Sequence, residues 1–420
     1  LSNTTGYSNV AVGKDAMLTN IGGHSNSAFG AAALEDNVSG NTNTAIGNVA
    51  LRCNTTGSNH VAVGCGALNR NTTGGDNSAV GTQSLFSNTT GFRNTAMGFG
   101  AMFNSTTSSN NTAVGYAASS AITTGACNIA IGANSLDANS TGSSNTAVGA
   151  GALTTNTTAS QNTAVGLNAM NKNTTGASNV GLGVLALACN TTASENTAVG
   201  EKALWKNTTG GCNTASGFQA LSTATTGGGN ASHGWRSLYL STTGFDNTAV
   251  GFQSGYNITT GNSNTAIGFR SSCNLTTGSN NIALGNNAGT DAVGNMVTTN
   301  NFIIIGNNSH TNAKIKIDWT VTSDLRDKTN FEDIPHGLDF VNKLKPVKFN
   351  FKKSREDDTP HGNARYGFKA QDILALEGDN PIIIDNTDTE HLGYTAGNML
   401  PVLVNAIKEL KAEIELLKNK

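Results

Sequence analysis

The chain has 420 residues, of which 50 are glycine and only 12% are charged, and its formal net charge is −2 at pH 7. This charge balance excludes the strongly basic surface that nucleic-acid-binding proteins need. Residues 1–295 carry 9 Lys/Arg and 9 Asp/Glu. Residues 296–420 carry 16 Lys/Arg, 18 Asp/Glu and all five prolines. Such a shift in composition predicts at least two domains of different architecture.

No apolar run is long enough to span a membrane, and the first residues do not resemble a secretory signal. The chain begins with Leu rather than Met, which indicates a fragment or a processed chain. No motif predicts a cofactor or a metal ion. The cysteines have no metal-ligand spacing and no Cys-x-x-Cys pair, so we expect free thiols in a chain made in a reducing compartment. They are Cys53, Cys65, Cys127, Cys189, Cys212 and Cys273.

Residues 1–295 repeat the 17-residue unit Asn-Thr-Ala-Val-Gly-x-x-Ala-Leu-x-x-Asn-Thr-Thr-Gly-x-x. The glycine that closes the first half recurs from Gly13 to Gly285 in steps of 17, and the asparagine four residues before it is replaced only by His60. A repeat without insertions must stack on itself. Short apolar pieces between Asn/Thr/Gly turns favour strands. We therefore predict a mainly β fold, a β-solenoid (β-roll) of 17 coils that rises ~4.8 Å per coil to roughly 80 Å.

The repeated positions have distinct expected roles. Glycine permits a positive φ at the corners, and stacked asparagines can hydrogen-bond along the axis. Within Asn-Thr-Ala-Val-Gly the Ala and Val side chains point to opposite faces. We expect Val and the later Leu or Met inside the coil, and the small Ala outside, where another backbone could approach. Since so short a coil buries little alone, we expect three solenoids to pack together.

The Asn-x-Ala-Val/Ile-Gly signature across about residues 1–290 resembles the left-handed β-roll heads of trimeric autotransporter adhesins. The resemblance implies a parallel β-roll within a homotrimer. It implies little about function, because such rolls serve many fibres. The repeat is longer than the units common in those heads, which leaves the handedness open.

Aromatic residues follow the closing glycine in four consecutive coils, at Phe218, Trp235, Phe252 and Phe269, and a shorter column is formed by Phe99 and Tyr116. Such a column could contact a sugar ligand. The better supported interpretation is structural, since Ser216 and His233 replace apolar residues nearby and the rings would refill the core.

The Thr-Thr pair of each turn would fit an ice-binding surface, and the Asn-x-Thr sequons would fit glycosylation. However, turns and sheet edges favour Thr and Asn without either function. No calcium-binding Gly-Gly-x-Gly-x-Asp pattern is present. The isolated carboxylates Asp76, Asp137 and Asp246 are not paired as a glycosidase requires. We therefore expect the repeat domain not to be an enzyme.

Residues 296–322 form a predicted β connection, because the 17-residue register ends after Gly285. Phe302–Ile305 is a candidate buried strand. The alternation of Lys314–Trp319 indicates a half-exposed strand.

Residues 323–420 carry several motifs in a fixed order: Ser-Asp-Leu-Arg-Asp-Lys at 323–328, Leu344–Lys352, Tyr366–Ile373, Gly393-Tyr394 and Leu400–Leu410. These motifs resemble the C-terminal intramolecular chaperone domain of phage tail fibres and endosialidase-type tailspikes. The resemblance implies an α+β domain that drives homotrimer folding of the preceding fibre. It also implies that this domain releases itself by cleavage between Thr322 and Ser323.

By the same resemblance Ser323 is the nucleophile and Lys328 the general base of a single-turnover, self-cleaving serine endopeptidase. A serine hydroxyl needs a base, and a lysine can serve where burial depresses its pKa. A Ser–Lys pair is a known variant of the Ser–His–Asp triad. The offset of five residues does not by itself show that the side chains meet. Asp324 and Arg326 match the motif without an assigned role beyond a positioning ion pair.

The last helix carries apolar residues in 4-3-4-3 spacing, at Leu403, Ile407, Leu410, Ile414 and Leu417. This spacing is typical of a coiled-coil seam. The seam covers only about two heptads, so a helix packed on its own domain is the alternative.

Together these features predict a viral, phage-type tail fibre for host attachment, located in the virion and assembled in the host cytoplasm. Its expected partners are two further copies, an upstream virion or tail attachment segment, and a host-surface receptor or glycan. No nucleic acid or membrane insertion is expected. A bacterial trimeric surface adhesin and a polysaccharide-binding or -degrading tailspike fragment are the alternatives.

Overall fold

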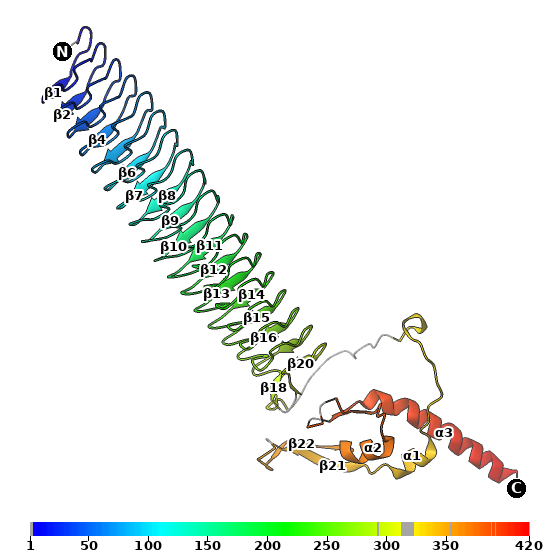
Figure 1. Cartoon of the computed structure of the whole chain (residues 1–420). Helices are drawn as coiled ribbons and strands as arrows, with labels where there is room; N and C mark the ends of the chain where they lie inside the picture. Colours follow the sequence, from blue (N-terminus) through cyan, green and yellow to red (C-terminus); the bar gives the residue numbers. More distant parts are fainter. Residues whose placement is uncertain are drawn as a thin grey trace. The chain divides into compact units, whose positions relative to one another are not determined.

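The computed structural model describes the whole chain apart from residues 1–2, 292–293, 312–322, 353–354, 388, 391 and 420. The described chain divides into two compact units (Figure 1). The first comprises Leu1–Gly289 with Met296–Ile305, and the second comprises Thr290–Asn295 with Gly306–Lys420. The first unit therefore continues to Ile305, beyond the boundary expected at residue 295.

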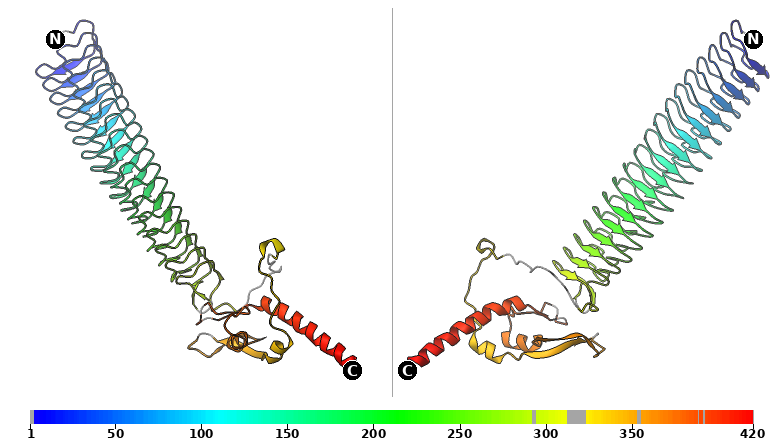
Figure 2. Two further views of the ribbon diagram at one scale, coloured as in Figure 1. Left: turned by 45° about the vertical axis from the view of Figure 1, so that its right-hand side comes forward. Right: turned by 180° about the vertical axis from the view of Figure 1, so that it is seen from behind.

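The first unit is the predicted β-solenoid, and Figure 2 shows its strands stacked along one side. Each coil contributes one strand of three residues, and successive strands pair in parallel 17 residues apart, as Ala147 does with Ala164. The strands are β1 (Val10–Val12), β2 (Ser27–Phe29), β3 (Thr44–Ile46), β4 (Val61–Val63), β5 (Ser78–Val80), β6 (Thr95–Met97), β7 (Thr112–Val114), β8 (Ile129–Ile131), β9 (Thr146–Val148), β10 (Thr163–Val165), β11 (Val180–Leu182), β12 (Thr197–Val199), β13 (Thr214–Ser216), β14 (Ala231–His233), β15 (Thr248–Val250), β16 (Thr265–Ile267) and β17 (Ile282–Leu284).

A last rung, β20 (Ile303–Ile305), pairs in parallel with β17 and confirms the strand expected at Phe302–Ile305. Only Ile304 of this strand is buried, whereas Ile303 and Ile305 are exposed, so the expectation of a buried strand was wrong for these two. The strand expected at Lys314–Trp319 lies outside the described residues.

The second apolar piece of each repeat forms a turn and not a strand. It contains two residues of positive φ, for example Asn168 and Met170, each at 52°. β-Branched residues are genuine outliers in this left-handed conformation. The conformation explains why the position of Met170 holds Leu or Met in most coils, Ser or Gly in the others, and never Val or Ile.

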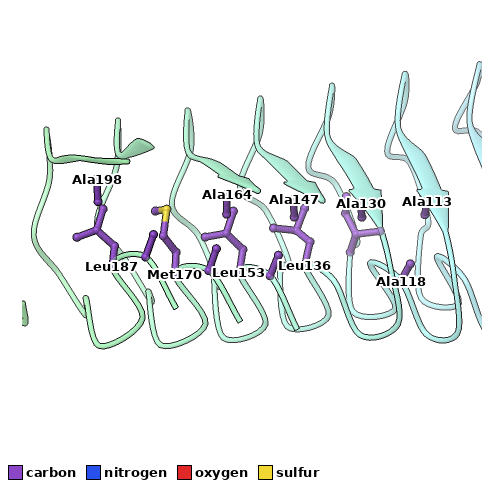
Figure 3. Close-up of a cluster of buried hydrophobic side chains, with 14 of the residues drawn as sticks. Ala113, Ala118, Ala130, Leu136, Ala147, Leu153, Ala164, Met170, Leu187 and Ala198 are labelled. Atoms are coloured by element: carbon purple, nitrogen blue, oxygen red, sulfur yellow. The ribbon is translucent and has the colours of Figure 1, made fainter. Parts of the chain in front are cut away.

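The interior of the solenoid is filled by the strand alanines and by the later leucines or methionines (Figure 3). Ala147, Leu153 and Ala164 are completely buried. The prediction was thus confirmed for the leucine position and wrong for the strand, where alanine lies inside and Val165 is 38% exposed. The reason is space, because a coil of this size leaves room for only a methyl group opposite each leucine, and the alternating larger side chain must point outward.

Four coils lack the core leucine or methionine, and all but the last of them, which has Gly289, replace it from another position of the same repeat. Ser119, Gly255 or Ser272 stands at the leucine position, and Ile122, Ile258 or Leu275 stands three residues later in place of asparagine. These three apolar side chains are buried. A Cβ on Gly255 would lie 3.1 Å from Cδ1 of Ile258, so the isoleucine occupies the vacated space. Each coil thereby avoids the cavity that a lost leucine would leave.

Two ladders of buried asparagines connect the coils, as predicted. In the first, the backbone N–H of Asn145 donates to Oδ1 of Asn128 at 3.0 Å, and its Nδ2 donates to the carbonyl of Ala159 at 2.9 Å. In the second, Nδ2 of Asn54 donates to Oδ1 of Asn37 at 2.8 Å. Because buried polar groups are costly without partners, these bonds hold each coil in register with the next.

His60 takes the place of asparagine in the first ladder and is only 1% exposed. Its Nε2 lies 2.7 Å from the carbonyl oxygen of Gly74, and its Nδ1 lies 3.3 Å from the backbone nitrogen of Asn77. A carbonyl only accepts and an amide N–H only donates, so the ring is neutral with its proton on Nε2. Burial lowers the pKa of His60 below its ordinary value of 6.5.

We expect His60→Asn to reduce the acid sensitivity of the solenoid. The unfolded chain binds a proton at His60 near pH 6.5 while the folded chain does not, so the free energy of unfolding falls as the pH decreases below about 6.5. Urea unfolding at about pH 7.5 and pH 5.5 measures the difference, which should be larger for the wild type than for the variant. Equal losses in both chains would contradict this role of His60.

The second unit is an α+β domain. Its core consists of Phe340, Ile373, Ile383, Ile384, Met399 and Val402. The carboxylate of Glu409 accepts a hydrogen bond of 2.6 Å from the backbone N–H of Leu338 and so caps the first helix. The elements are β18 (Thr290–Asp291), β19 (Gly294–Asn295), the 3₁₀ turn η1 (Leu325–Asp327), α1 (Leu338–Lys343), β21 (Val347–Lys352), β22 (Pro360–Gly367), α2 (Ala370–Glu377), β23 (Ile384–Asp385), β24 (Gly393–Tyr394) and α3 (Ala396–Lys418).

All six cysteines are free, as expected. Among the helices in the described part of the chain, none combines the length and apolarity needed to cross a bilayer.

Candidate functional site

The motif at residues 323–328 is folded into the single 3₁₀ turn η1. The carboxylate of Asp324 caps this turn by accepting a hydrogen bond of 2.9 Å from the backbone N–H of Arg326. The turn closes where the backbone N–H of Lys328 donates to the carbonyl of Leu325 at 3.2 Å. As a result the side chain of Lys328 reaches back to Ser323, and its Nζ lies 2.5 Å from Ser323 Oγ.

The structure thus brings together the two residues predicted as nucleophile and base, which their spacing in the sequence could not show. Thr322, the residue on the other side of the predicted cleavage point, lies outside the described residues. The arrangement supplies a serine hydroxyl and an amine in direct contact, which is the minimum that a Ser–Lys mechanism requires.

Asp324 and Arg326 form an ion pair beside this contact. Nη2 of Arg326 lies 2.6 Å from Oδ2 of Asp324, and Nε lies 3.1 Å from Oδ1. The hydrogen bonds from the side chain and the backbone of Arg326 lower the pKa of the Asp324 carboxyl, and the same carboxylate raises the pKa of Arg326. Both groups are therefore charged over the whole physiological range, and the pair braces the turn that carries Ser323 and Lys328.

In the single chain this site is open to solvent. Ser323 and Lys328 are both exposed, and so are the neighbouring apolar side chains of Leu325 (70%) and Phe331 (67%). A lysine acts as a base where burial favours its neutral amine, and unpacked apolar side chains are typical of surfaces that a partner covers. The contact between Ser323 and Lys328 is present in the chain, whereas buried surroundings for it are not.

None of the four aromatic residues belongs to the solenoid core, so the interpretation that they refill it was wrong. Phe252 and Phe269 are exposed, and Phe218 and Trp235 are half-buried. Their rings stack on one another along the axis, with 4.7 Å between the centroids of Trp235 and Phe252 and 5.2 Å between those of Phe252 and Phe269. Because neighbouring rings cover one another's faces, the column presents mainly ring edges. This differs from the open face on which a ligand ring stacks.

The helix α3 is only partly covered by its own domain. Met399, Val402 and Ala406 are buried. The residues predicted as a coiled-coil seam border this buried stripe, since Leu403 lies four residues after Met399 and Leu410 lies four residues after Ala406. All five seam residues are exposed, and they are Leu403, Ile407, Leu410, Ile414 and Leu417. The first turns of α3 therefore pack on the domain, as in the alternative, and the coiled-coil seam stays a prediction.

Comparison with known protein families gives one match, in which the sequence model of the family described as chaperone of endosialidase covers residues 323–380. The match begins at Ser323, the predicted first residue of the domain. The predicted motifs at Gly393-Tyr394 and Leu400–Leu410 lie beyond it. No curated protein and no solved structure matches the chain. The chain therefore carries a chaperone-of-endosialidase domain in its C-terminal region, preceded by a β-solenoid of seventeen coils.

Proposed function

We propose that this chain is a tail-fibre protein of a phage-type virus, whose C-terminal domain assembles the fibre as a homotrimer and then releases itself by cutting between Thr322 and Ser323. The observation that carries the proposal is the 2.5 Å contact between Lys328 Nζ and Ser323 Oγ, at the residue where the family match begins. A long solenoid of nearly identical coils upstream of this point is the kind of product that needs an assembly domain.

The proposed cleavage uses Ser323 against its own amide bond. The neutral amine of Lys328 takes the hydroxyl proton, and Oγ attacks the carbonyl carbon of Thr322. The bond to the Ser323 nitrogen breaks, and Lys328 returns the proton to the departing amine. Water then hydrolyses the ester between Thr322 and Ser323, which leaves a carboxylate on one fragment and a free serine on the other. Each chain reacts once, because the cut separates the site from its substrate.

The exposure of the dyad supports a coupling of cleavage to assembly. A single chain leaves Lys328 in water, so the buried surroundings that make lysine a base must come from another copy. The apolar side chains of Leu325 and Phe331 beside the dyad are available for such a contact. Cleavage would then occur only after the chains have joined.

The exposed face of α3 supports the trimerising role. Leu403, Leu410 and Leu417 repeat at heptad spacing and remain 38%, 44% and 70% exposed in the single chain. Identical coils can pair in the wrong register, and assembly from distant contacts is slow and prone to aggregation. Joining the C-terminal helices first would fix one register, and removal of the domain would leave the fibre kinetically trapped. The fibre would act in the virion by binding a host-surface receptor or glycan.

Expression of residues 1–322 without the domain tests the chaperone role. We expect aggregated or monomeric material, whereas the full chain yields soluble trimers measured by sedimentation velocity. The matched control is the full chain with Ser323→Ala, which keeps the domain attached and should also give soluble trimers. Soluble trimers of 1–322 in normal yield would contradict the proposal.

A further inference from the structure

The outward side of the solenoid sheet carries a column of apolar side chains along nearly its whole length, beside a second column that is mostly Thr or Ser. This outer face is formed by the first and third residues of β1 to β17 and of β20. The third residues are apolar except Ser216 and His233, and the first are only Thr, Ser, Ala, Val or Ile. Their side chains are exposed or half-buried in every strand, as Val12, Met97 and Val165 illustrate. The feature follows from the inward position of alanine, which turns the larger side chains outward.

The outer face carries no Lys, Arg, Asp or Glu. His233 is the only ionisable residue on it, although other exposed positions of the same coils carry charges such as Lys172, Glu201 and Asp246. A sheet surface that faces only water normally carries charged or strongly polar side chains. The separation of charged and apolar positions indicates that the outer face is covered in the assembled protein.

The size of the face matches a stable protein interface. Three residues per strand give a width of about 10 Å, and the stack of coils is roughly 80 Å long. The resulting area of about 800 Å² is what one partner contributes to a standard interface.

We propose that this outer face is the surface through which copies of this chain pack against one another. The inference rests on the proposed homotrimer and names the surface that the solenoids use. The repeat itself identifies the occupant, because the face presents the same kind of pair, most often Thr or Ser beside a larger apolar residue, at the same place in almost every coil. Only a partner with the same axial repeat offers a matching side chain at each coil. A second copy in parallel register has this repeat because its sequence is identical.

The packing follows from the two columns of the face. In most coils an exposed or half-buried apolar residue such as Val165 stands beside a half-buried Thr or Ser such as Thr163, so that an apolar column runs along the solenoid beside a column of hydroxyls. The apolar column of one copy can pack against that of another without burying a charge.

Site-specific photocrosslinking of the full chain tests the surface. p-Benzoylphenylalanine is placed at Val165 on the outer face or, as the matched control, at Thr175, which is exposed in a turn of the same repeat unit. We expect irradiation to give covalent dimers and trimers from position 165 and to lose these bands at position 175. Sedimentation velocity on each sample establishes the oligomeric state independently.

A paired charge substitution gives a second readout. Val148→Lys with Val165→Lys should lower the trimer fraction, whereas Thr158→Lys with Thr175→Lys on the exposed turns should leave it unchanged. Trimers that crosslink from position 175 and not from 165 would overturn this surface and leave the proposed homotrimer intact. A chain that sediments as a monomer and yields no crosslinks would overturn both.

Discussion

Ser323→Ala leaves the chain at its full mass, whereas the wild-type chain separates into two fragments that end at Thr322 and begin at Ser323. The variant lacks the oxygen that attacks the amide, so no intermediate can form. We expect complete loss of cleavage on denaturing gels and by mass spectrometry. An uncut wild-type chain under assembly conditions would show that residues 323–420 serve as a permanent cap and not as a self-releasing domain.

Two further variants separate the roles around the dyad. Lys328→Arg keeps a positive charge and hydrogen-bond donors but cannot act as a base, since arginine is not deprotonated in proteins. We expect it to be uncut while still assembling as trimers. Thr329→Ala removes an exposed hydroxyl next to Lys328 and should cleave like the wild type. Normal cleavage of Lys328→Arg would show that Lys328 contributes only its charge or its hydrogen bond.

The second large effect is expected at the glycine that closes each strand. Gly149 has a φ of 133°, and a Cβ at this position would lie 2.5 Å from the carbonyl oxygen of Gly166 in the next coil. Gly149→Ala therefore combines backbone strain with a clash that neither coil can relieve, because both are held by their neighbours. We expect a loss of about 3 kcal/mol or more in the free energy of unfolding.

The matched control for this prediction is Gly100→Ala. Gly100 also has a positive φ, of 62°, but a Cβ there meets nothing within 4 Å. Alanine already occupies the equivalent position at Ala32 and Ala117. The substitution should cost about 1 kcal/mol. Urea unfolding of the wild type and the two variants measures their free energies of unfolding, which should fall from the wild type to Gly100→Ala to Gly149→Ala. Equal stability of both variants would contradict the proposed clash.

The sequence alone determined the architecture of the long first unit. Seventeen glycines at a constant spacing allow only a structure that advances by one coil per unit, and the uniform asparagines predict ladders that the structure confirms. The motifs after residue 323 identified the family in the same way, because they preserve both residue type and order. These are local or strictly periodic properties, which a sequence displays directly.

The orientation of the strand was not determined by the sequence. Alternation shows that Ala147 and Val148 point to opposite sides, but not which side is the interior. The outcome depends on the cross-section of the coil, in which Leu153 from the following turn already fills most of the space. The substitution of Ile122 where Ser119 replaces leucine was a signal in the sequence that could have located the core.

The candidate site also has features that the sequence showed and features that only the folded chain showed. Sequence order identified Ser323 and Lys328, but their contact depends on the 3₁₀ turn capped by Asp324, which a five-residue spacing does not reveal. The exposure of this pair, of the α3 seam and of the outer face appears only once the chain is folded. Each arises because a single chain has too little interior to bury all of its apolar side chains. The tertiary structure therefore decided which apolar surfaces remain exposed, whereas the sequence decided the repeat that makes the outer face regular.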